Sequence, residues 1–169
     1  MTARWEQIGI SVLSGTASSV SFQNINDQYR KFRVVAYLLK DGSNDNSGGA
    51  LRFNGDSTSI YAMQYLQAFS TTVTAARAAS QAQIRLYDTF DADGQALLVV
   101  EVAKPTSSKV ARVIQQAAFP EAPSGAISVG FRYGEWAKTD ALINRIDIIT
   151  STGNFVAGTR IVLYGARDI

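Results

Sequence analysis

The chain has 169 residues, 46% of them hydrophobic and 18% charged, which suits one globular domain that buries roughly two-thirds of its unfolded surface. It contains no histidine and no cysteine, which excludes disulfides, thiolate chemistry, histidine-based triads and the usual zinc sites. Positive and negative charges nearly balance, with a formal net charge of +2, so we expect no nucleic-acid partner. The sequence shows no signal peptide and no apolar run of ~20 residues, so we expect a soluble protein made in a cytoplasm, with no membrane partner.

Alternating apolar and polar residues predict strands through the first part of the chain. Two runs, 8–13 and 18–22, are separated by the short turn-like segment 14–17, and this spacing predicts a hairpin. A longer strand is predicted over 30–40. Its core-facing residues would be Phe32, Val34, Ala36 and Leu38, because neighbouring side chains on a strand project to opposite faces.

Strand-sized runs continue after the polar loop 41–49, and Gly, Pro, Asn and Asp clusters separate most of them. They cover 50–54, 60–69, 82–87, 96–103, 110–119, 126–136, 143–150 and 159–165. The alanine-rich residues 74–83 are compatible with a short helix or a strand, and the absence of a helical apolar stripe favours a strand.

This spacing, without alternating helices, predicts the fold class: an all-β antiparallel β-sandwich, jelly-roll-like, in a single domain over 1–169. Residues 1–15 would be part of it as an N-terminal arm or an edge strand.

The acidic residues give no convincing catalytic or metal motif. Asp88, Asp91 and Asp93 precede Gly94, but a calcium loop aligned on this glycine lacks the required ligands at its first and twelfth positions, so a polar turn is favoured. A glycosidase needs paired carboxylates, and nothing ties together the available glutamates, which are Glu6, Glu101, Glu121 and Glu135. The glycine spacing of 125–130 lacks the lysine and hydroxyl of a phosphate loop. We therefore expect no catalytic, cofactor or metal site, and no enzyme.

Two further groups have both a functional and a structural interpretation. The aromatic residues Trp5, Tyr61, Tyr65, Tyr133 and Trp136 could stack on sugars, but such residues more often fill a core or a seam between subunits. The basic residues Arg30, Lys31 and Arg33 lie in an alternating strand, where a solvated strand surface is favoured over nucleic-acid binding.

The most distinctive segment of the sequence is 143–165, INRIDIITSTGNFVAGTRIVLYG. Its alternation predicts an apolar face on Ile146 and Ile148 and a turn of positive φ at Gly153 and Asn154, with Phe155 under the turn. A second strand would follow, with Ile161 and Leu163 paired to the first strand and Tyr164 on the other face.

This ending resembles that of a diffuse group of small virion proteins of tailed bacteriophages. Three earlier segments resemble the same group, with fewer matching residues per length of chain. They are 18–25 with Tyr29; Phe53, Asn54, Asp56 and Tyr61; and 134–136 with Thr139. The resemblance implies a capsid decoration or cement protein, or alternatively a tail or fibre component. Its expected partners are copies of itself, as a homotrimer, and the major capsid protein or other virion proteins. A carbohydrate-binding module for host attachment is the alternative from a different class.

Overall fold

The computed structural model describes residues 4–41, 48–69, 71–87, 95–103, 109–121 and 126–167, which form twelve strands. No helix occurs in these ranges, so no membrane-spanning helix is found in them. The strand β3 (Tyr29–Leu39) shows how the sequence pattern produces the fold. Its predicted core residues Phe32, Val34, Ala36 and Leu38 are fully buried, whereas the residues between them keep solvent contact. This confirms the inward face that alternation predicted.

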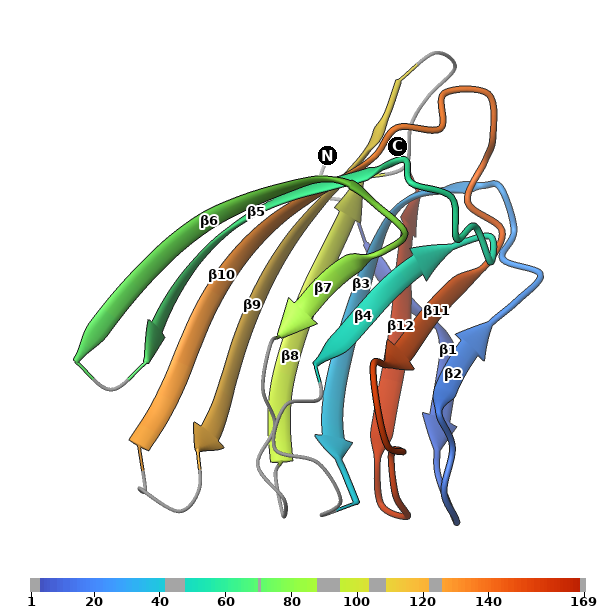
Figure 1. The fold of residues 1–169 in the computed structure, drawn as a ribbon. Helices are drawn as coiled ribbons and strands as arrows, with labels where there is room; N and C mark the ends of the chain where they lie inside the picture. The colour runs from blue at the N-terminus through green and yellow to red at the C-terminus, as the bar shows by residue number, and fades with distance from the viewer. Residues whose placement is uncertain are drawn as a thin grey trace.

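The strands form two antiparallel sheets that pack against each other (Figure 1). The eight-stranded sheet has the order β1 (Trp5–Val12), β12 (Arg160–Arg167), β3, β8 (Gln95–Ala103), β9 (Ala111–Glu121), β10 (Ala126–Trp136), β5 (Tyr61–Phe69) and β6 (Thr72–Gln81). The four-stranded sheet has the order β2 (Ser19–Phe22), β11 (Ile146–Thr150), β4 (Gly49–Phe53) and β7 (Ile84–Tyr87). The predicted all-β antiparallel sandwich is therefore confirmed.

Nested strand pairing makes this sandwich a jelly roll. β1 pairs with β12, β2 with β11, β3 with β8 and β4 with β7. These eight strands give the half-sheets β1-β12-β3-β8 and β2-β11-β4-β7. The first four strands thus pair with the last four of this set in reverse order, as in one long hairpin, and successive pairs lie in alternate sheets. This winding defines a double-sheet jelly roll.

Two inserted hairpins enlarge one sheet. β5 and β6 are inserted between β4 and β7, and β9 and β10 follow β8. Both hairpins join the same sheet through the β5–β10 pairing, so this sheet extends past the four-stranded sheet on the side of β9, β10, β5 and β6 (Figure 1). The four-stranded sheet covers the extension only in part, where β7 packs against β5, β9 and β10 and where Phe53 of β4 packs on Trp136.

An aromatic cluster joins the inserted hairpins to the four-stranded sheet. Phe53 of β4 packs on Trp136 of β10, with ring centroids 5.5 Å apart, and Tyr61 of β5 stacks on both rings. The close approach of β7 to β10 depends on Gly134, because a Cβ there would lie 2.7 Å from Cδ1 of the buried Ile84. A larger residue would push the two sheets apart.

Two pairing predictions are wrong. The runs 8–13 and 18–22 do not form a hairpin, because β1 pairs with β12 in one sheet and β2 with β11 in the other. Likewise, β11 and β12 do not pair with each other: β11 lies between β2 and β4, and β12 lies between β1 and β3. In both cases the connection crosses from one sheet to the other, as winding into a jelly roll requires.

Local predictions in the same segments mostly hold. Phe155 is fully buried and bridges Ala17 and Lys40, and Gly153 has a φ of 68°. Asn154 does not share the positive φ that was predicted for it. The alanine-rich segment forms the strand β6, as favoured, and nearly all of its residues are exposed because it is the outermost strand of the sheet.

Candidate functional site

The outer face of the eight-stranded sheet carries two adjacent rows of residues, here called the apolar belt. The strand registers align one row as Val12, Arg160, Tyr37, Leu97, Ala118, Val129, Ala68 and Val73. The other row is Ile10, Val162, Val35, Val99, Gln116, Phe131, Leu66 and Ala75. Only Arg160 and Gln116 interrupt the apolar character of these rows. At about 4.8 Å per strand, the belt crosses the sheet over roughly 34 Å.

Solvent exposure concentrates on this face. The exposed large apolar side chains of the described residues number eleven, and ten of them lie on the outer face. Eight belong to the belt, and Ile114 and Tyr133 lie in the row beside it. Their exposed fractions run from 38% for Tyr133 to 68% for Val73, and the eleventh, Leu142, lies between β10 and β11. Contiguous apolar surface of this kind marks an interaction site in a soluble protein.

The belt is hollowed over β8, β9 and β10. A depression of about 260 Å³ is lined by Leu97, Val99, Gln116, Ala117, Ala118, Val129, Gly130 and Phe131. It arises because the short side chain of Ala118 stands between those of Leu97 and Val129 in the same row. Phe131 stands at its margin and is 56% exposed. The belt therefore presents a projecting aromatic ring beside a shallow apolar hollow.

Charged residues lie beside the belt and are few. Glu101 accepts two hydrogen bonds from Arg33, from Nε at 2.9 Å and from Nη2 at 2.5 Å. The Arg33 guanidinium also lies over the Trp5 ring, 4.5 Å from its centroid. On the next strands Arg112 donates to the Tyr133 hydroxyl. These partly exposed contacts contribute little to stability and leave the belt itself uncharged over β8, β9, β10, β5 and β6.

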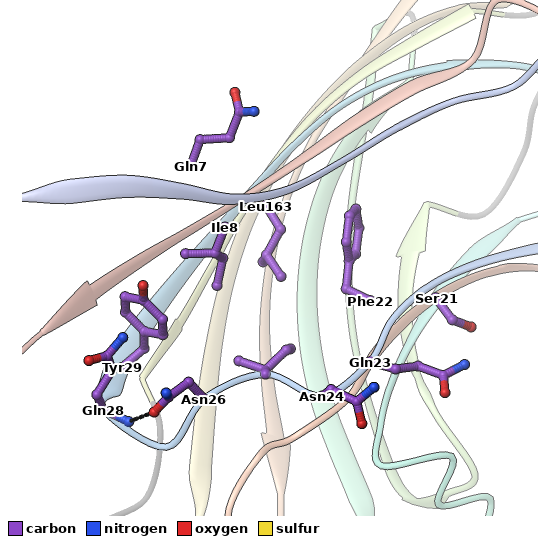
Figure 2. A pocket seen from close by; sticks show the side chains of 11 residues that line it. Gln7, Ile8, Ser21, Phe22, Gln23, Asn24, Asn26, Gln28, Tyr29 and Leu163 are labelled. Carbon is purple, nitrogen blue, oxygen red and sulfur yellow. Dashed lines mark hydrogen bonds between the residues drawn. The ribbon is translucent and has the colours of Figure 1, made fainter.

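A second hollow opens at the edge of the sandwich between β1 and β2, with a volume of about 490 Å³. Figure 2 shows that Ile8, Phe22 and Leu163 project into the space between the two sheets, whereas Gln7 and Gln23 project away from it. Its lining is therefore mixed, with these apolar side chains on the core side and mostly polar side chains around them. The carboxamides around it do not converge on one point, as recognition of a sugar would require.

The aromatic residues considered for sugar stacking do not form a platform. Trp136 and Tyr61 are buried in the core; the Trp136 indole donates to Asp56, and the Tyr61 hydroxyl donates to the Asp56 carbonyl at 3.0 Å. Burial raises the pKa of Asp56, but hydrogen bonds from Thr58 and Trp136 outweigh it, so this pKa lies below its ordinary value. Of the five aromatic residues, Tyr133 alone is both beside the belt and exposed, at 38%.

The carboxylates considered for catalysis are distributed over different surfaces. Glu6 accepts from the Tyr29 hydroxyl and from Arg167, Glu101 pairs with Arg33 on the outer face, and Glu135 lies two strands from Glu101. Within the described ranges no three acidic residues group closely enough to hold a metal ion. Asp88, Asp91, Asp93, Gly94 and most of the 41–49 loop lie outside the described residues, as does the Glu121 side chain.

The inner face of the extension holds a small buried polar cluster. Arg132 lies over the Tyr65 ring, 4.7 Å from its centroid, and donates to the Gln67 side chain at 3.0 Å. Next to it, Gln115 is 1% exposed, and neither polar atom of its side chain has a hydrogen-bond partner among the described residues. A buried amide without a partner costs stability.

Comparison of the chain with protein-family models, curated proteins and solved structures found no match. Sequence reasoning did not identify the belt, although a signal was present: the run 97–100, Leu-Leu-Val-Val, is apolar on both faces of its strand. An apolar run without alternation is typical of a strand that is covered on both faces.

Proposed function

We propose that this protein is a non-enzymatic structural component of a tailed-bacteriophage particle, a capsid decoration or cement protein that works as a symmetric oligomer. The observation that carries the proposal is the apolar belt, because a surface that spans a whole sheet suits a permanent contact in an assembly. A small catalytic site does not need such a surface.

Two features support placement in a virus particle. The double-sheet jelly roll is a frequent architecture of viral capsid domains. The ending over 143–165 resembles that of small virion proteins, and the topology gives it a structural role, since β11 and β12 lie inside opposite sheets. A tail or fibre component is the alternative within the same class.

Particle composition tests the proposal. We expect quantitative mass spectrometry of purified particles to detect this chain in a fixed ratio to the major capsid protein, and labelled particles to show it on the head. A chain found only in the tail supports the alternative. Its absence from particles rules out both forms of the proposal.

A matched pair of variants tests whether the belt is the surface that matters. Phe131→Asp places a charge in the belt, and Leu142→Asp places the same charge on the large exposed apolar residue that, among the described side chains, lies outside the outer face. We expect the first variant to be lost from particles and the second to be incorporated normally. Equal incorporation of both would remove the belt as the assembly surface.

A further inference from the structure

We infer that the apolar belt is covered by another copy of this chain. The inference deepens the proposed function, on which its biological setting rests, by naming the partner of the belt. Three observations favour a second copy over an unrelated protein: the size of the belt, its charge balance and its shape.

The size of the belt matches one side of a stable protein interface. Ten large apolar side chains, about half exposed on average, present roughly 500 Å² if a fully buried apolar side chain removes about 100 Å² from water. A standard interface covers about 800 Å² per partner, of which about 60% is apolar. The belt supplies that apolar share by itself. Homodimer interfaces are somewhat more apolar than this average, about 65%.

The charge balance of the extended half of the outer face permits two identical copies to meet there. On β8, β9, β10, β5 and β6, the outer-face charged residues described are Glu101, Glu135, Arg112 and Arg77, two of each sign, whereas Lys31, Arg33 and Arg160 make the half over β3 and β12 positive. Like surfaces with a net charge would repel one another, whereas a balanced surface can pair its opposite charges across the contact. No complementary charge on a different protein is needed.

The shape of the belt also provides both halves of a contact. Phe131 projects beside the hollow whose floor is Ala118, so one copy can supply the aromatic ring and another the apolar hollow that receives it. Aromatic residues seated in such hollows are the usual anchors of protein interfaces.

Cysteine protection tests this inference without disturbing the fold, because the chain has no cysteine of its own. Leu97→Cys and Val129→Cys introduce a single thiol into the belt, and Leu142→Cys introduces one outside it. We expect maleimide to label the belt thiols about tenfold or more slowly than the Leu142→Cys thiol, since the rate follows the fraction of molecules with an uncovered belt. In urea all three should label equally fast.

Sedimentation of the purified chain provides the second measurement. The wild type should sediment as a multiple of 18.2 kDa, and so should Leu142→Asp, whereas Phe131→Asp should sediment as a single chain. Circular dichroism checks that Phe131→Asp keeps its β structure; if it does not, the cysteine variants decide alone. A single-chain mass for the wild type, with belt thiols labelled as fast as the control thiol, would overturn the inference.

The outcome is separable from that of the proposed function. A single-chain protein found in particles removes the self-contact and leaves the virion role, with another virion protein as the partner of the belt. An oligomer that is absent from particles keeps the self-contact and removes the virion role.

Discussion

Individual residues of the inner face show where this fold departs from a purely apolar core. Gln115 occupies a position whose neighbours along β9 are the buried Val113 and Ala117, yet its amide has no hydrogen-bond partner among the described residues. Arg132, directly opposite on β10, bonds to Gln67 instead. The sequence pattern predicted an inward-facing strand here but gave no indication that a polar residue would be buried without a partner.

Replacing this amide should stabilise the protein. An unsatisfied buried polar group costs about 1–3 kcal/mol, so we expect Gln115→Leu to raise the free energy of unfolding by about 1 kcal/mol after some loss to imperfect packing. Urea titration measures this, with Gln7→Leu as the control, since Gln7 is exposed and points away from the core (Figure 2). A loss of stability in Gln115→Leu would show that the amide does bond in solution.

At the scale of elements, β10 shows how glycine sets the distance between the sheets. Gly134 and Gly130 lie on the same strand and the same face, two pleats apart. A Cβ at Gly134 would meet three atoms of Ile84 at 2.7 to 3.0 Å, whereas a Cβ at Gly130 would meet nothing closer than the Leu66 carbonyl at 3.8 Å. Ile84 is fully buried and has no room to move away.

This pair provides a matched test of sheet packing. Gly134→Ala should lower the free energy of unfolding by about 1–3 kcal/mol, the usual cost of overpacking a core. Gly130→Ala should be neutral or stabilise by up to about 1 kcal/mol, because alanine loses less backbone entropy on folding. Thermal or urea unfolding of both variants measures the difference. Equal effects would mean that β7 does not press on β10 in solution.

The strand pairings are also decided at this scale, and here sequence reasoning was least reliable. It located most strands closely, including β3 and β10, because alternation is a local property. It paired β1 with β2 and β11 with β12 because they are neighbours in the chain. In a jelly roll successive strands lie in opposite sheets, so proximity in sequence does not predict pairing.

At the scale of the whole molecule, the two inserted hairpins change what the jelly roll can do. They widen one sheet to eight strands and continue the belt over Val129, Phe131, Leu66 and Val73. Without them the outer face would end at β8, and the hollow between Leu97 and Val129 would not exist. The extension is thus the part of the fold that makes a large contact surface.

The nature of the belt predicts how self-association responds to salt. If apolar burial drives the contact, the sedimenting mass should be unchanged between low salt and about 1 M sodium chloride, because screening acts on charges and not on apolar surface. Sulfate should strengthen the association. Dissociation at high salt would instead assign the contact to Arg33, Glu101 and the other charged residues beside the belt.

The sequence alone determined the fold class, most strand positions and the inward face of β3, because these follow from the period-two spacing of apolar residues. It also excluded histidine and cysteine chemistry outright. The tertiary structure decided which strands pair, which of the aromatic candidates are buried, and that residues as distant as Ile10, Phe131 and Val73 form one belt. The reason is physical: a strand's periodicity is encoded locally, whereas a surface depends on the register of strands far apart in the chain.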